Sequence, residues 1–311
     1  MQMDEQLLYA LQIRYIKLHF TISFIEDSIL PVHKVSALRG GMGEMLLRAN
    51  CIRDRACGSC DFESECIVQR TMYSKFDEKP DYVTDGSESI GYVLECENYQ
   101  MYFSKGETLS FNLILFGKTI VYFNQYLQAF YSLGMCGIGV GHAKFMIVSI
   151  QNTCFQDILN GHDIVMKNYQ VQTVSHYVNW RMKKITGAEK TLVFQTPTTI
   201  KYRGEFLQEF CIDAILNAVR RRIHMLDYFE GISNDFYHDY QVPVPELEGR
   251  QQRHVKVRRY SSRKGPMFLH GITGFVQLQE LDASTIPLLL AGELIHIGKN
   301  TSFGFGRYQV M

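Results

Sequence analysis

The chain has 311 residues, of which 46% are hydrophobic and 21% are charged. That composition is typical of a soluble globular protein, and the length suits two domains of about 150 residues better than one core. Lys and Arg together number 32, as do Asp and Glu, so no net charge attracts a polyanion. A nucleic-acid surface would have to come from local segregation of charge.

The N-terminus, Met1 to Gln6, lacks the basic and apolar regions of a secretory signal. No run of about 18 apolar residues is present, so no membrane span is expected. The sequence therefore predicts a cytoplasmic protein, in which the eight cysteines are thiols or metal ligands rather than disulfides.

The first half of the chain alternates strands and helices in the order βαββαβ. Residues 11–25 alternate apolar and polar side chains, which predicts a half-buried strand, and residues 34–48 carry apolar side chains at helical spacing. The remaining expected elements are strands at 90–97 and 107–117, a helix at 119–133 stopped by Gly134, a Gly-rich loop at 137–141 and a strand at 144–150. This order is that of a ferredoxin-like unit.

The second half repeats the same order. Its expected elements are strands at 191–202, 255–261, 268–278 and 304–310, helices at 205–228 and 282–296, and a loop at 239–249. In both halves the second helix runs into a Gly-rich loop before the last strand, at 137–141 and at 298–306.

These elements predict an α+β fold of two tandem ferredoxin-like (RRM-like) domains. We place the N-terminal domain at 1–152, with a cysteine-rich loop inserted at 49–70. The C-terminal domain is placed at 191–311, and residues 153–190 are a connector without assigned structure.

The inserted loop carries four cysteines, Cys51, Cys57, Cys60 and Cys66, with a central C-x2-C pair. Four thiolates at this spacing can enclose one tetrahedral metal ion, so the pattern favours zinc, with an iron–sulfur cluster as the alternative. Four cysteines leave no open coordination position, so such a metal would be structural. The other interpretation is four buried free thiols.

The segment 250–279 contains no Asp or Glu. Within it, Lys256 and Arg258 lie on one face of the expected strand, opposite Val255 and Val257. This strip can neutralise a phosphate backbone, or it can be an edge strand kept soluble by charge. The basic residues of the segment that we assign to RNA binding are Arg253, Lys256, Arg258, Arg259, Arg263 and Lys264, and Arg220, Arg221 and Arg222 add a cluster on the preceding helix.

The C-terminal loop has glycines at 298, 304 and 306. Lys299 follows the first of them, and Arg307 follows the last. Backbone N–H groups of Gly298, Gly304 and Gly306 can line a concavity that accepts a phosphate, flanked by Lys299 and Arg307. The alternative is a tight crossover without a ligand. Neither Gly-rich loop matches the P-loop or the dinucleotide pattern, which argues against nucleotide hydrolysis and nicotinamide chemistry.

His33 is the favoured general base among the ten histidines. It follows the first strand and starts the first expected helix, beside Lys34. An imidazole with a near-neutral pKa can move a proton, and a helix N-terminus favours its neutral form. His142 and Lys144 are a second candidate pair, and His296 is expected to help hold the C-terminal loop.

Together these segments resemble the RAMP superfamily, specifically the sixth Cas family, the CRISPR precursor-RNA-processing endoribonucleases. The match is most specific at the C-terminal end, and the four-cysteine loop resembles one branch of that family. The matching segments are 288–308, 38–46, 115–117, 133–139, 259–263 and 269–275.

The resemblance implies metal-independent cleavage within each CRISPR repeat. The ribose 2′-hydroxyl would attack the adjacent phosphate and leave a 2′,3′-cyclic phosphate and a 5′-hydroxyl, with His33 as the base and Lys34 as the cation on the phosphate. The implied partner is CRISPR repeat RNA, with other Cas proteins of an interference complex and a second copy of the chain as further candidates.

Two alternatives stay open. The first is a non-catalytic RNA-binding RAMP subunit of an interference complex. The second is a metal-dependent enzyme at the cysteine loop, which would lose activity in EDTA.

Overall fold

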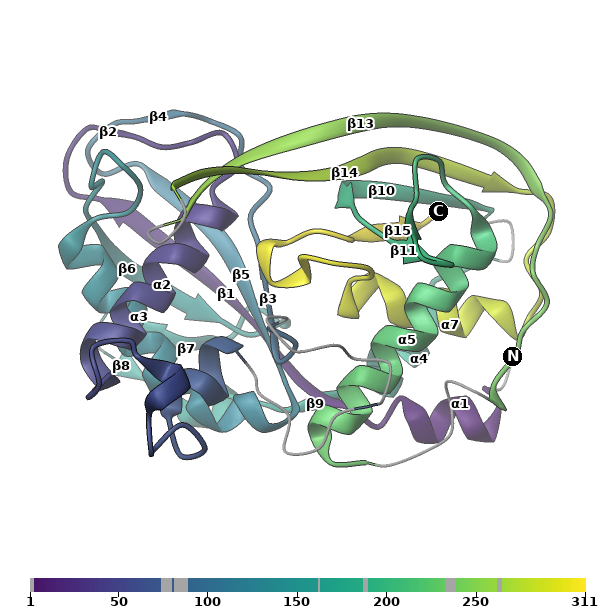
Figure 1. Cartoon of the computed structure of the whole chain (residues 1–311), viewed down its shortest axis with the longest axis horizontal. Coiled ribbons are helices and arrows are strands. Elements are labelled where there is room, and N and C mark those ends of the chain that lie inside the picture. Colours follow the sequence, from purple (N-terminus) through teal and green to yellow (C-terminus); the bar gives the residue numbers. More distant parts are fainter. Residues whose placement is uncertain are drawn as a thin grey trace.

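The fold is seen in a computed structural model, which describes residues 3–73, 80, 89–161, 163–186, 190–232, 239–261 and 265–311, without the side chains of residues 260 and 261. In these ranges no helix has the length and apolar character needed to cross a bilayer. The molecule consists of two lobes, each with its own antiparallel sheet (Figure 1).

The N-terminal sheet has seven strands in the order β3-β5-β1-β6-β7-β8, and β9 also pairs with β1. Its first four strands have the ferredoxin-like arrangement, because β1 lies at the centre between β5 and β6. Buried side chains of the helices α2 and α3 cover one face of this sheet. The bounds are β1 Arg14–Phe24, α2 Val35–Asn50, β3 Tyr92–Glu95, β5 Thr108–Phe116, α3 Phe123–Cys136, β6 Phe145–Gln151, β7 Asp157–Asn160, β8 Asp163–Ile164 and β9 Gln172–Thr173.

The C-terminal sheet has the order β13-β14-β10-β15, which is the same arrangement. The α+β fold of two tandem ferredoxin-like units is therefore confirmed. Every residue of α7 is buried, as expected for a largely apolar helix, and its one carboxylate, Glu293, forms an ion pair with Arg181. The bounds are β10 Thr191–Thr198, α5 Ile212–Glu230, β13 Leu247–Ser261, β14 Gly265–Leu278, α7 Thr285–Ile295 and β15 Tyr308–Val310.

Shorter elements fill the connections. They are α1 Glu5–Ala10, β2 Ser28–Ile29, η1 Cys57–Ser59, η2 Gln69–Tyr73, β4 Tyr102–Phe103, η3 Gly117–Tyr122, η4 Met166–Asn168, α4 Val174–Met182, β11 Lys201–Tyr202, β12 Glu205–Phe206 and η5 Thr301–Phe303. The connector that had no assigned structure thus holds β7, β8, β9 and α4.

Two predicted helix ends were wrong. Helix α3 continues through Gly134 and ends at Cys136, before Gly137, whose φ is 87°. A Cβ atom on Gly134 would lie 2.4 Å from the carbonyl oxygen of Phe145. Gly134 therefore allows α3 to pack closely on β6 and does not end the helix.

The helix expected at 205–228 begins at Ile212 instead. Residues 205–206 form β12, which pairs with β11 through a tight hairpin. Arg203 and Gly204, the two central residues of that turn, both have positive φ, as a type I′ turn requires. The loop expected at 239–249 is also shorter, because β13 already begins at Leu247.

The two lobes share a continuous apolar core. Tyr15, Val93 and Phe116 lie on the sheet face opposite α2 and α3, and they pack in one cluster with the buried residues of α5 and α7. The hairpin of β13 and β14 extends from the C-terminal lobe over the N-terminal lobe, where β13 contacts α2 (Figure 1). The lobes are therefore held together by burial and by this hairpin.

Candidate functional site

The C-terminal Gly-rich loop lies between the two lobes and contacts both. Its glycines 298, 304 and 306 have φ of 79°, 77° and 78°, a region that side chains with a Cβ rarely adopt. A Cβ on Gly304 would lie 2.7 Å from the carbonyl oxygen of Leu94 in β3, and one on Gly306 would lie 1.9 Å from that of Ile297. These glycines therefore allow close approach of backbone to backbone, and the end of the loop is buried.

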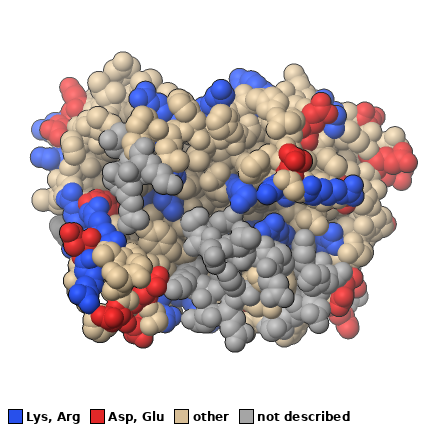
Figure 2. All heavy atoms as spheres, in the orientation of Figure 1, with Lys and Arg blue, Asp and Glu red and all other residues tan. Residues whose placement is uncertain are grey.

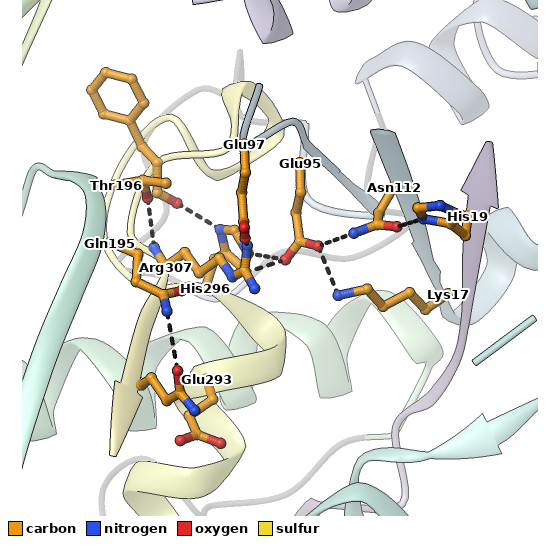
Figure 3. Close-up of polar contacts among 12 residues, drawn as sticks. Lys17, His19, Glu95, Glu97, Asn112, Gln195, Thr196, Glu293, His296 and Arg307 are labelled. Carbon is orange, nitrogen blue, oxygen red and sulfur yellow. Dashed lines mark hydrogen bonds and ion pairs between the residues drawn. The ribbon is translucent and has the colours of Figure 1, made fainter. Parts of the chain in front are cut away.

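Glu95 holds this loop to the N-terminal sheet. Its buried carboxylate accepts from Lys17 Nζ at 2.7 Å and from His296 Nε2 at 2.9 Å, and Asn112 Nδ2 donates to it at 2.9 Å (Figure 3). Arg307 Nε lies 3.6 Å from the same carboxylate. Burial alone would raise the pKa of Glu95, but these cations and hydrogen bonds outweigh it and hold the pKa well below its usual range.

His296 is fully buried, and each of its two ring nitrogens faces an oxygen atom. Its Nδ1 faces the carbonyl oxygen of Phe305 at 2.9 Å, and its Nε2 faces the Glu95 carboxylate. Both partners only accept hydrogen bonds, so both contacts form when both ring nitrogens carry protons. His296 therefore holds the loop, as expected from its place in the sequence.

Arg307 does not present its charge to a ligand in this conformation. Besides Glu95, its guanidinium forms an ion pair with Glu97. The part of the loop that contains Gly304, Gly306 and Arg307 is thus engaged with carboxylates of the first lobe. The expectation that this half holds a phosphate stays a prediction, and the geometry does not favour it.

The first half of the loop lines a cavity of about 210 Å³ between the lobes. Gly298 and Lys299, which the sequence assigns to an anion site, are among its lining residues, and anion binding there stays a prediction. Among the described residues that line this cavity there is no Asp or Glu. The cationic residues of the lining, which we call the interlobe cations, are Arg39, Lys201, Arg221, Arg222 and Lys299.

Hydrogen bonds fix two of the interlobe cations. Arg39 of α2 donates from Nε to Ser302 Oγ at 3.2 Å, and its guanidinium carbon lies 4.1 Å from the centre of the Phe303 ring. Arg222 is buried and donates from Nε to the carbonyl oxygen of Ile295 at 3.1 Å. Positive charge held in a cavity with low-dielectric walls attracts anions strongly, and phosphate oxygens suit guanidinium donors.

The basic strip of β13 is exposed except at its end. Arg253, Lys256 and Arg258 are exposed, whereas Arg259 is half-buried with its guanidinium carbon 4.7 Å from the Phe303 ring centre. Arg263 and Lys264 lie outside the described residues. Figure 2 shows a row of Lys and Arg side chains that runs from near the middle of the visible face toward one side, while other Lys and Arg lie among Asp and Glu nearer the edges.

His33 lies in the turn before α2, half-buried, with its ring centre 5.8 Å from that of Tyr99. Burial and the adjacent Lys34 lower the pKa of His33, which favours the neutral imidazole that a general base needs. Lys34 is 1% exposed, and its ammonium donates to the carbonyl oxygen of Asn98 at 2.8 Å. In this conformation Lys34 does not present its charge to a phosphate.

The four cysteines of the inserted loop line a second cavity, of about 300 Å³. The backbone N–H of Arg55 donates to Cys51 Sγ at 3.2 Å, a contact that suits a thiolate. Among the described residues, however, no three His, Cys, Asp or Glu side chains are arranged to hold a metal ion. The donor set fits zinc, and metal binding stays a prediction.

Sequence reasoning missed several of these residues. Arg39 and Lys201 were not singled out, because the cavity is formed by segments that are far apart in the sequence and come together only in the fold. Glu95 had a signal that could have been used, since it ends a strand whose three preceding residues are apolar. An acid in such a position is buried and needs a partner.

Two family models match the chain. Residues 11–176 match a model named AF_1859_N and described as an N-terminal domain, and residues 192–308 match the model of the CRISPR-associated endoribonuclease Cas6. An uncharacterized protein of Archaeoglobus fulgidus is 22% identical over 289 residues, which cover 90% of this chain and 92% of that protein.

Solved structures share the fold. A partial Cas6-RT-Cas1–Cas2 complex matches with a TM-score of 0.57 at 10% identity, covering 96% of this chain and 46% of that one. A Cas6 product complex matches with a TM-score of 0.51 at 13% identity, covering 95% of this chain and 99% of that one. The chain therefore spans less than half of the first structure's chain and nearly all of the second.

Replacing Glu95 by Gln should destabilise the protein by about 3 kcal/mol at neutral pH, because it removes the buried counter-charge of the partly buried Lys17 and Arg307. The pKa of Glu95 is lowered in the folded state, so its contribution is present above the unfolded pKa of about 4.3 and is lost as the pH falls through the folded value. Denaturant unfolding of wild type and Glu95→Gln between neutral and acidic pH measures the difference.

The matched control is Asp61→Asn, which breaks the exposed ion pair with Arg53 and should change stability by less than about 1 kcal/mol. Equal stability of wild type and Glu95→Gln at neutral pH would contradict the role of Glu95.

Proposed function

We propose that this chain binds and cleaves CRISPR repeat RNA. It belongs to the AF_1859_N family through residues 11–176 and, through residues 192–308, to the CRISPR-associated endoribonuclease Cas6 family. The observation that carries the proposal is the cavity between the lobes, lined by the interlobe cations and by the first half of the Gly-rich loop. A chain without net charge gathers in this cavity the local positive charge that a phosphate backbone needs.

Helix α2 connects this cavity to His33. Val35 lies beside Gly304 of the loop, at 3.4 Å from the Cβ position, and Arg39 bonds Ser302 at the cavity. His33 lies two residues before Val35, and from Val35 to Arg39 the helix spans about 6 Å at a rise of about 1.5 Å per residue. An RNA strand with one phosphate in the cavity would therefore bring a neighbouring nucleotide toward His33.

In the proposed reaction His33 takes the proton of a ribose 2′-hydroxyl. The O2′–P bond forms as the P–O5′ bond breaks, and the leaving 5′-oxygen takes a proton from water. The product ends are a 2′,3′-cyclic phosphate and a 5′-hydroxyl. Cations on the non-bridging oxygens stabilise the charge that develops, and here the interlobe cations replace Lys34, whose ammonium is held in the interior.

A second candidate function is RNA binding without cleavage, in complex with other Cas proteins. The burial of Lys34 favours it, because the cation expected beside the base is engaged with the carbonyl oxygen of Asn98. Both candidate functions require the cationic cavity for RNA binding, so only an assay of RNA cleavage distinguishes them.

Removing two interlobe cations should weaken RNA binding. For Lys201→Ala combined with Lys299→Ala we expect the slope of log affinity against log salt to fall by about 1 for each phosphate that the variant no longer neutralises. Filter binding of labelled repeat RNA at several salt concentrations measures it. Lys183→Ala, which removes an exposed cation directly after α4, is the control that should leave the slope unchanged. An unaltered slope in the double variant would remove the cavity from the RNA path.

Cleavage should persist in EDTA and depend on His33. Wild-type protein should cut 5′-labelled repeat RNA at one site and leave a cyclic phosphate, and His33→Ala should lower the rate about 10²-fold or more. His176→Ala, on the exposed side of α4, is the matched control. Tight binding without any cleavage by wild type would support the non-catalytic candidate, and loss of activity in EDTA would point to a metal-dependent enzyme.

The four-cysteine loop should hold a structural metal, zinc before an iron–sulfur cluster. We expect about one metal ion per chain in natively purified protein, little in Cys60→Ser, and full occupancy in the control Cys154→Ser, whose thiol is exposed elsewhere. Metal analysis by mass spectrometry together with thermal unfolding tests this. Metal-free wild-type protein with unchanged stability would show that the cysteines are free thiols.

A further inference from the structure

Six apolar side chains are exposed together beside His33. We call them the tyrosine patch: Ile29, Val32, Tyr99, Met101, Tyr102 and Val140. Tyr102 is 68% exposed and Tyr99 is 51% exposed. Single exposed apolar residues need no explanation, but a contiguous group on a protein of this kind marks a site of interaction.

Main-chain contacts make the patch contiguous. Ile29 of β2 is the cross-strand partner of Tyr102 in β4, and the N–H of Leu30 donates to the carbonyl oxygen of Met101 at 2.8 Å. A Cβ on Gly141 would lie 3.4 Å from the carbonyl oxygen of Ile29, so the loop that carries Val140 lies against β2.

His33 lies at the border of the patch. Its ring meets that of Tyr99 edge to face, with 85° between the ring planes. Tyr99 therefore lies one ring contact away from the proposed base. If a ribose presents its 2′-hydroxyl to His33, the attached nucleobase is within reach of the Tyr99 ring.

The charges around the patch suit a nucleic acid. Lys144 borders it on the side of β6, where its carbonyl oxygen accepts from the N–H of Ile25, and its side chain is exposed. His142, also exposed, belongs to the loop that carries Val140. The nearby carboxylates of Asp27 and Glu107 accept hydrogen bonds from backbone N–H groups of residues 104 and 105.

We propose that the tyrosine patch stacks unpaired nucleobases of the RNA, next to the phosphate that His33 serves. This inference rests on the proposed function and specifies its substrate. Tyrosine rings stack on any base, but a base within a duplex has both of its faces covered. The cleavage site in the repeat RNA must therefore be single-stranded, with Tyr99 and Tyr102 as positioning residues.

The test uses repeat RNAs that carry 2-aminopurine at one position each, because stacking on an aromatic ring lowers the fluorescence of this base. With the full-length wild-type protein we expect quenching at one or two positions beside the cleavage site. Tyr99→Ala and Tyr102→Ala should restore the fluorescence there and weaken RNA binding by about 5- to 100-fold. Tyr99→Phe keeps the ring and should behave as wild type.

The matched control is Tyr9→Ala, which removes a 59% exposed ring on α1, next to the other lobe. It should change neither the fluorescence nor the affinity. Circular dichroism checks that each variant is folded, and Tyr99→Phe reports on stacking even if the alanine variants are destabilised.

The outcomes separate the two claims. Wild-type protein that binds no repeat RNA would overturn the proposed function and this inference with it. RNA binding without quenching at any position, or quenching that survives both alanine substitutions, would overturn the inference alone. Efficient cleavage of a repeat whose cleavage site is locked in a duplex would also overturn it.

Discussion

The buried carboxylate of Glu95 is the interaction on which the geometry of the site depends. Removing a carboxylate from water is costly, and here the positive charges of Lys17 and Arg307 and a hydrogen bond with His296 compensate that cost. Lys17 belongs to the central strand of the first lobe, whereas His296 and Arg307 belong to the last loop of the second. One charge on an edge strand thus fixes the Gly-rich loop relative to the N-terminal sheet.

This pairing divides the loop into two parts with different tasks. Its second half directs its one cation, Arg307, to Glu95 and Glu97, and its glycines bring backbone against backbone. Its first half, from Gly298 to Phe303, faces the cavity with the interlobe cations. Glu95 and Glu97 therefore engage Arg307, whereas Lys299 lies in the half of the loop that lines the cavity.

Periodicity was sufficient to predict the fold, because the order of strands and helices in each half leaves one common arrangement. Local exceptions came from glycines whose role is tertiary, such as Gly134 against β6, and from the hairpin at Arg203 and Gly204. The site was less predictable because the partner of a charge lies far away in the chain. The sequence pattern shows that Lys34 and Arg307 are cations, but not that Asn98 and Glu95 engage them.

Three features of different chemistry follow one another along the start of α2. Arg39, one of the interlobe cations, lies in the second turn of α2, and the proposed base His33 lies just before the helix. Tyr99 of the tyrosine patch contacts the ring of His33. Phosphate, ribose and base are the three chemical parts of a nucleotide, and they need charge, proton transfer and stacking in turn. Helix α2 is held at both ends of this path, by Lys34 bonded to the Asn98 carbonyl and by Arg39 bonded to Ser302. The burial of Lys34, which removes it as a phosphate ligand, thus fixes the helix that carries the base.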